Sequence, residues 1–306
     1  MKLLLPYRIE HLILSRPYFD PAGLIFAVEL ADDHQDDPSQ WRFSQGKPIG
    51  FVHASFAPSD DLSDLDLSTG IISQLKIRSD GDYDRESIAD QLLTHGLNYL
   101  KGRGAKSVAG GGLFPFAPFY VGLYGGSEIP GVLSKDSQFH QTLTRNAFEQ
   151  QDRVVIMQRR LAEFRPIGGR DQLSVRRKYQ INAVVDPKEN SWWETCTLGM
   201  ANKERFSIYH KQNQRVCGNV SFWDMQPLAG GGPNTARGMY GLNVPEEFRR
   251  SGIATFLVGE ALKYYMQQGV EYVEAQTLAS ETAAIGVFEK LGFEHVDEGV
   301  LLSKSL

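Results

Sequence analysis

The sequence has few cysteines, no long apolar run and no excess of basic residues, and each shortage excludes a class of protein. Its 306 residues contain two cysteines, Cys196 and Cys217, too few for a disulfide scaffold. No apolar stretch reaches the ~18 residues that a membrane-spanning helix needs. A formal net charge of −5 argues against a nucleic-acid surface and mildly favours a cationic partner. The seven histidines form no pattern typical of a metal site or a nucleophile triad.

The remaining composition is that of an ordinary globular protein. Apolar residues make up 42% and charged residues 23%, and 306 residues suit two domains of about 150. The apolar start is interrupted by Pro6 and Arg8, too early for a signal-peptide core. We therefore expect a cytoplasmic protein with no membrane partner. Cys217 lies within an apolar strand pattern, which predicts a buried free thiol.

The segment 238–262 is the most informative part of the chain. It predicts a strand, a turn, and a helix that starts near Ser251, because its later apolar residues recur at helical spacing. Gly252 lets the backbone approach a ligand closely, and the first N–H groups of a helix have no partner within it. These donors and the helix dipole predict an anion site of pyrophosphate size, and Arg249 and Arg250 add positive charge.

Two motifs in this half resemble a known family. The pattern Arg249-x-x-Gly252-x-Ala254 resembles the coenzyme A signature of the GNAT N-acetyltransferase superfamily. The segment 284–293, Ala-Ile-Gly-Val-Phe-Glu-Lys-Leu-Gly-Phe, is similar to its second signature, Ala-x-x-x-Tyr-x-x-x-Gly-Phe, and follows a predicted strand at 269–277. The resemblance implies an α/β (α+β) fold with a mixed, mostly antiparallel sheet, splayed between its fourth and fifth strands and flanked by helices.

The same resemblance implies transfer of an acetyl group from acetyl-CoA to an amine. The backbone N–H of Val244 matches the position that polarises the thioester carbonyl, in the manner of an oxyanion hole. The acceptor is expected to be a small molecule or a peptide, with no nucleic acid involved, and the chain a monomer or homodimer. The expected coenzyme-binding residues are Leu242, Asn243, Val244, Arg249, Arg250, Ser251, Gly252, Ile253, Ala254 and Thr255.

The sequence departs from the family at three positions that matter for catalysis. Phe288 replaces the tyrosine that often acts as general acid, Gly238 stands where some members have a glutamate, and Glu281 replaces a common asparagine. The catalytic residues therefore cannot be copied from the family.

Two other residues are candidates for catalysis. Tyr240 is four residues before Val244, so strand alternation predicts that the two share a face. Glu274 is expected on the opposite wall of the cleft. For either residue, a structural role remains the alternative.

The chain contains a weak internal repeat. Residues 83–108 align without a gap on 248–273. The identical positions are Arg85, Ile88, Ala89, Leu92, Leu97, Tyr99, Gly104 and Val108. We therefore predict tandem GNAT-like domains at 1–163 and 178–306, joined by a linker at 164–177. In the first copy Asp84 and Ser87 replace the arginine and glycine of the motif, which predicts poor coenzyme binding there.

The first copy also has a Gly/aromatic insertion at about 110–131. One interpretation is a loop packed over the interface between the copies; the other is that Tyr124, Ser127 and Glu128 reach into an acceptor pocket. Mycothiol synthase has a similar tandem architecture, but no motif here extends that likeness to its substrate. The alternative functions are a non-catalytic acyl-CoA-binding or scaffold protein and an aminoacyl transferase, and the intact coenzyme motif counts against the second.

Overall fold

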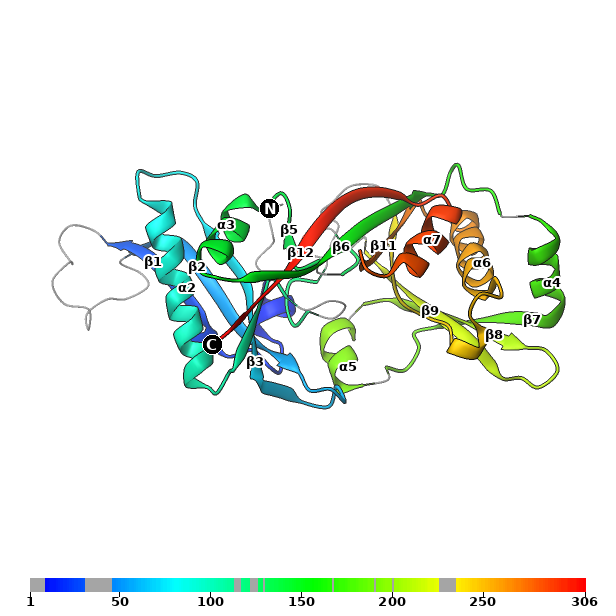
Figure 1. Cartoon of the computed structure of the whole chain (residues 1–306), viewed down its shortest axis with the longest axis horizontal. Helices are drawn as coiled ribbons and strands as arrows, with labels where there is room; N and C mark the ends of the chain where they lie inside the picture. Colours follow the sequence, from blue (N-terminus) through cyan, green and yellow to red (C-terminus); the bar gives the residue numbers. More distant parts are fainter. Residues whose placement is uncertain are drawn as a thin grey trace.

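The computed structural model describes residues 9–30, 46–112, 117–121, 126–128, 130–166, 168–189, 191–199, 201–225 and 235–306. Within these residues twelve strands form one sheet, with helices packed on it (Figure 1). The strand order is β1-β2-β3-β4-β12-β6-β11-β10-β9-β8-β7, and β5 pairs with β12. Most neighbouring strands are antiparallel, which confirms the predicted mixed, mostly antiparallel architecture.

The amino-terminal half is built around helix α2 (Arg85–Gly102), which lies within the first copy of the repeat. Helix α2 forms where apolar residues recur at helical spacing, and it buries Leu92, Leu93 and Leu100 in a core shared with Val52 and Ile72 of the sheet. The strands are β1 (Leu24–Leu30), β2 (Gly46–Pro58), β3 (Leu65–Ile77), β4 (Ser107–Gly110), β5 (Val132–Leu133) and β6 (Glu149–Arg160). The helices are η1 (Glu10–Leu14), η2 (Pro21–Gly23), α2 (Arg85–Gly102) and α3 (Ser137–Arg145).

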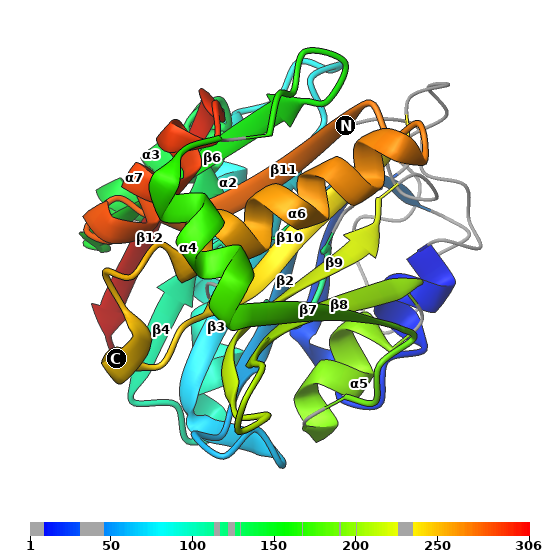
Figure 2. The same cartoon turned by 90° about the vertical axis from the view of Figure 1, so that its right-hand side faces the viewer.

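The carboxy-terminal half begins with a helix inside the segment predicted as a linker. This helix, α4 (Arg170–Lys178), packs near the first turns of α6 (Figure 2). The strands are β7 (Tyr179–Val185), β8 (Lys203–His210), β9 (Val216–Asp224), β10 (Ala236–Asn243), β11 (Tyr272–Leu278) and β12 (Glu294–Ser305). The other helices are α5 (Trp192–Leu198), η5 (Glu246–Phe248), α6 (Ile253–Gln267) and α7 (Thr282–Lys290).

The last strands of the two halves are exchanged. Strand β6 of the first half pairs with β11 of the second, and β12 of the second pairs with β4 of the first. The two exchanged strands also pair with each other, side by side across the middle of the molecule (Figure 1). Met157 of β6 belongs to the core of the second half, and Val300 and Leu302 of β12 belong to the core of the first. Each half therefore receives one strand of its sheet from the other half. The predicted domain boundaries stay predictions.

The insertion adds a second contact between the halves. Phe119 and Tyr120 pack with Tyr18 of the first half and with Trp193 of α5, which is fully buried. His53 lies beneath this cluster, with its Nδ1 2.9 Å from the hydroxyl of Tyr120. Phe114, Phe116 and Tyr124 of the insertion lie outside the described residues.

Both cysteines are buried free thiols, as predicted for Cys217. Over the ranges given above, no helix is long and apolar enough to cross a membrane.

Candidate functional site

A hollow opens in the second half where β10 and β11 separate. The two strands pair in parallel only from Ala236 to Met239 and from Tyr272 to Ala275, and beyond these residues they diverge. The hollow has a volume of about 220 Å³. Its lining comes from both strands, from α7 and from the insertion: residues 239–242, Gln276, Thr277, Ala284, Phe288 and Glu128. The predicted splay between the fourth and fifth strands of this half is therefore present.

A β-bulge in β10 shapes one wall of the hollow. Tyr240 lies opposite Ser221 of β9 and Asn243 lies opposite Asn219, so β10 has one extra residue between them. Gly241 lies in the bulge with φ of +62°, a conformation that glycine adopts without a steric penalty. The extra residue reverses the alternation of side chains along the strand.

The bulge makes one sequence-based argument wrong. Alternation predicted that Tyr240 and Val244 share a face, but Tyr240 packs with Trp223 on one face of the sheet. Val244 and Leu242 pack against the core beneath α6, on the other face. Tyr240 and Leu242 both line the hollow, which therefore crosses the sheet from one face to the other. Burial raises the pKa of the Tyr240 phenol above its usual value.

The first turn of α6 lies next to the divergent end of β10. Gly252 precedes the helix with φ of +81°, and within the part of the chain that the structure describes α6 has no side-chain cap. Arg249 folds back so that its Nε donates to the carbonyl oxygen of Val244 at 3.0 Å, which closes the loop. These uncapped N–H groups and the positive end of the helix dipole fit an anion such as a pyrophosphate.

In the first half, the N–H groups of the corresponding turn are capped by the side chain of Asp84. The carboxylate of Asp84 accepts hydrogen bonds from the backbone N–H groups of Glu86 and Ser87, both at 3.1 Å. Asp84 thus occupies the position of an anion at the start of α2. The two halves differ at this turn, because one helix N-terminus is filled by a carboxylate and the other is open.

The remaining predicted coenzyme residues surround the same turn. Asn243 is the last residue of β10, while Arg250 has φ of +58° within the loop. Ile253 is buried in the core, Thr255 is buried in the first turn of α6, and Ser251 is exposed.

Glu274 lies in β11 with its carboxylate buried and fully engaged. Its Oε1 accepts from the backbone N–H of Ser127 at 2.6 Å and from Nε2 of Gln276 at 3.2 Å. Its Oε2 accepts from Nε2 of Gln158 at 3.0 Å. Burial raises the pKa of this carboxyl, and these hydrogen bonds oppose the rise. Glu274 therefore anchors the insertion of the first half on the sheet of the second.

Glu128, the next residue of the insertion, lines the hollow itself. Its backbone oxygen accepts from Nε2 of Gln276 at 3.1 Å, and its side chain is buried with a residue exposure of 5%. Within the described residues no hydrogen bond or ion pair to its carboxylate is formed. Burial, and then the negative charge of Glu274, raise the pKa of Glu128 well above its usual range. Two adjacent carboxyls thus lie in different environments.

Gly238 gives the insertion the space to approach. A Cβ at this position would lie 2.6 Å from Nε1 of Trp223 and 2.8 Å from Cβ of Ser127. The indole N–H of Trp223 donates to the carbonyl oxygen of Ser127 at 2.9 Å. The absence of a side chain on β10 at this point therefore allows Ser127, and with it Glu128, to reach the sheet.

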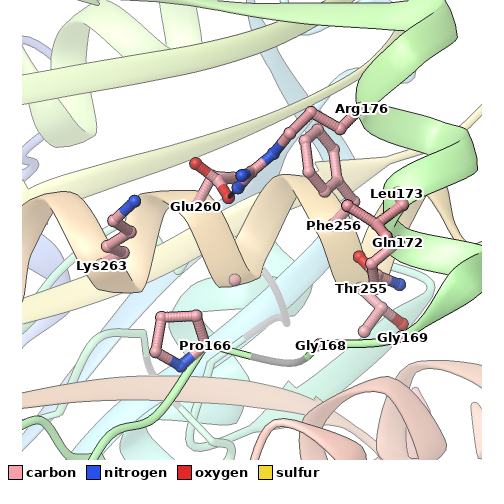
Figure 3. A pocket seen from close by; sticks show the side chains of 11 residues that line it. Pro166, Gly168, Gly169, Gln172, Leu173, Arg176, Thr255, Phe256, Glu260 and Lys263 are labelled. Carbon is pink, nitrogen blue, oxygen red and sulfur yellow. Dashed lines mark hydrogen bonds and ion pairs between the residues drawn. The ribbon is translucent and has the colours of Figure 1, made fainter.

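A second hollow, of about 260 Å³, lies between α4, the segment before it and the outer face of α6 (Figure 3). Arg176 of α4 and Glu260 of α6 form an ion pair on its wall, and Lys263 lies further along α6. It has Thr255 on its wall but does not include the divergent ends of β10 and β11. The separation of β10 and β11 therefore opens into the first hollow and not into the second.

Gln158 and Gln276 have roles that the sequence analysis did not identify. Both donate to Glu274, and they come from different halves of the chain. Gln158 lies next to Glu274 only because β6 is exchanged. For Gln276 a signal was present, because it is two residues after Glu274 on a strand and must share its face.

Comparison with known proteins agrees with this architecture. Residues 174–293 match the sequence model of the acetyltransferase (GNAT) family. No curated protein sequence matches the chain. The tandem GNAT protein from the clavulanic acid biosynthesis pathway has a TM-score of 0.57 at 14% identity, over 85% of this chain and 80% of that one.

Two further solved structures are similar. The glucosamine N-acetyltransferase region of a fungal multi-domain GH3 β-N-acetylglucosaminidase has a TM-score of 0.61 at 15% identity, over 93% of this chain and 38% of that one. A GCN5-related N-acetyltransferase from Sphaerobacter thermophilus has a TM-score of 0.52 at 12% identity, over 85% and 78% of the two chains. At these identities the likeness shows a shared fold.

Proposed function

We propose that this chain, whose residues 174–293 match the sequence model of the GNAT family of acetyltransferases, transfers an acetyl group from acetyl-CoA to an amine. Acyl transfer is the general activity that the family supports. The observation that supports one coenzyme site is the contrast between the two helix N-termini, open at Gly252 and filled by Asp84 in the first half.

The residues around Gly252 would hold the acyl donor. The backbone N–H groups at the start of α6 would bind its pyrophosphate, with Arg249 and Arg250 beside them. The thioester would lie between β10 and β11, with the N–H of Val244 polarising its carbonyl. When bound, the donor supplies an activated acetyl group. Leu242 and Phe288 line the hollow there and would exclude water from the thioester.

The acceptor amine must lose its charge before it can react. An alkylamine with a pKa near 10.4 is neutral in only about 1 molecule in 2,500 at pH 7, which costs roughly 4–5 kcal/mol. An α-amino group, with a pKa of about 7.7–8.0, costs only about 1 kcal/mol. An alkylamine acceptor therefore needs a base within the site. Tyr240, on the wall of the hollow, would supply a proton to the departing thiolate in place of Phe288.

Calorimetry and a thiol-release assay test the proposal. We expect one acetyl-CoA per chain, and we expect Gly252→Glu to abolish binding, since φ of +81° strains a side chain and the carboxylate repels phosphate. The acceptor probes are spermidine, glucosamine, and a peptide with a free α-amine and one lysine. Acetyl-CoA binding without thiol release for any probe would favour the non-catalytic alternative, and no binding at all would contradict the proposal.

A further inference from the structure

Two carboxylates from different halves of the chain lie at or beside the hollow between β10 and β11. Glu274 belongs to β11, but its oxygens are occupied by Ser127, Gln158 and Gln276 at 2.6, 3.0 and 3.2 Å. A carboxylate that accepts three hydrogen bonds is a weak proton acceptor, because those bonds stabilise its charged form. Glu274 is thus well suited to hold the insertion and poorly suited to take a proton from the substrate.

Glu128 has the opposite environment. It lines the hollow together with Tyr240 and Gln276, and no described side chain donates to its carboxylate. Desolvation and the neighbouring negative charge of Glu274 raise the pKa of Glu128, which makes its carboxylate the more basic of the two. Where a fold pushes the pKa values of two carboxyls apart, the two commonly have different roles.

The position of Glu128 is fixed by contacts on both sides. The backbone N–H of the preceding Ser127 is held by Glu274, and the Ser127 carbonyl accepts from Trp223 at 2.9 Å. The backbone oxygen of Glu128 accepts from Gln276. These hydrogen bonds come from β9 and β11 of the second half, and they hold the insertion beside Gly238 of β10.

We propose that Glu128, supplied by the first half, is the general base of the acetyl-transfer site in the second half. This proposal rests on the proposed function. The amine nitrogen attacks the acyl carbon, so that the N–C bond forms as the C–S bond breaks. Glu128 accepts the proton from the nitrogen, and the departing thiolate takes a proton from Tyr240 or solvent. Glu128 then releases its proton to solvent, and Tyr240, where it was the donor, takes one back from solvent, which restores the starting state. In the first half, the Asp84 carboxylate occupies the turn that corresponds to Gly252. That half would thereby contribute a catalytic residue instead of a coenzyme site.

The groups that face Glu128 set its pH dependence. In the described residues they are Glu274 from β11 and Tyr240 from β10, while α7 contributes the apolar Ala284 and Phe288. Only the ionised carboxylate accepts a proton, so kcat/KM rises as pH rises through the elevated pKa of Glu128. Removal of the Glu274 charge lowers the pKa of Glu128, which moves that rising limb to lower pH.

The test uses the full chain, acetyl-CoA and the best of the three amine probes, with kcat and kcat/KM measured across roughly pH 5–9. Glu128→Gln is expected to lower kcat by about 10²–10⁴-fold and to leave only the pH dependence that comes from ionisation of the amine itself. Glu128→Asp should keep the limb with reduced kcat, and Glu274→Gln should shift the limb to lower pH. The matched control is Glu289→Gln on the exposed face of α7, which should leave the profile unchanged.

Calorimetry with acetyl-CoA tells a loss of catalysis apart from a loss of coenzyme binding. Acetyl-CoA should bind Glu128→Gln as tightly as it binds the wild type. A Glu128→Gln protein with kcat within about threefold of wild type and an unchanged acid limb would overturn this proposal and leave the proposed function intact. A wild-type chain that transfers acetyl to none of the probes would overturn both.

Gly238→Ala offers a second variant, because its Cβ would displace Ser127 without removing the Glu128 carboxylate. This variant should also lower kcat.

Discussion

Removing the first half should unfold the second, because strand β6 would go with it. The fragment 172–306 lacks β6, which forms seven residue pairs with β11, from Tyr272 opposite Arg160 to Leu278 opposite Val154. At about one hydrogen bond per pair and a net value of about 1 kcal/mol for each, the lost pairing is worth roughly 7 kcal/mol. The edge of β11 would also be left open to aggregation.

Packing adds to that loss. The fragment also lacks Met157, Leu161 and Phe164, which are 2%, 0% and 4% exposed in the core of the second half. Burying one such side chain is worth about 1.5–3 kcal/mol, so the three contribute roughly 5–9 kcal/mol. Together with the pairing this matches or exceeds the total stability of a typical domain, about 5–15 kcal/mol.

Urea unfolding followed by circular dichroism checks the prediction. We expect 172–306 to lack a cooperative transition and to bind an apolar dye. The matched control is the fragment 149–306, which keeps β6 beside β11 and should be measurably more stable. If 172–306 is monomeric, unfolds cooperatively at the urea concentration that unfolds the full chain, and binds acetyl-CoA equally well, the reasoning from strand exchange is refuted.

Three smaller changes have definite expected outcomes. Burial lowers the pKa of His53 to about 4, below the usual 6.5, so unfolding takes up a proton; from pH 7 to pH 5 the wild type should lose about 2 kcal/mol more stability than His53→Phe in urea titrations. Equal losses would contradict this. Asp84→Ala removes two hydrogen bonds at the start of α2 and should cost about 0.5–2 kcal/mol in the same assay; no change would refute the capping role. Tyr240→Phe should lower kcat about 10²-fold with coenzyme binding intact, and an unchanged kcat would eliminate Tyr240 as proton donor.

Local sequence patterns predicted the elements of the second half well. The apolar spacing after Gly252 predicted α6, because the pattern reports which side of the helix is buried. The repeat correctly indicated a tandem fold, since the order of β1, β2, β3, α2, β4, α3 and β6 recurs in β8, β9, β10, α6, β11, α7 and β12.

Such patterns do not predict which strands pair with one another. Strands β6 and β12 show the burial of central strands, but alternation does not say which strand lies beside them, so their exchange was not foreseen. The bulge at Gly241 was missed for a related reason, because one extra residue reverses the faces without changing composition.

The candidate site was predicted only in part. The turn at Gly252 could be singled out from the sequence because the groups proposed to bind the coenzyme are contiguous backbone N–H groups. Glu128 is separated from Gly238 by more than a hundred residues, and only the folded chain brings them together. The sequence allows Ser127 and Glu128 either to reach a pocket or to cover the interface. In the structure Ser127 is anchored to Glu274, and Glu128 lies on the wall of the hollow. The roles predicted for Tyr240 and Glu274 stay predictions.

The most direct measurement is a crystal structure of the full chain with a non-reactive thioether analogue of acetyl-CoA. We predict one analogue per chain, with its pyrophosphate at the N–H groups that follow Gly252. Its acyl carbon should lie in the hollow between residues 239–242 and Gln276, within reach of the Glu128 carboxylate. An analogue bound in the first half, or in the hollow between α4 and α6, would contradict the account.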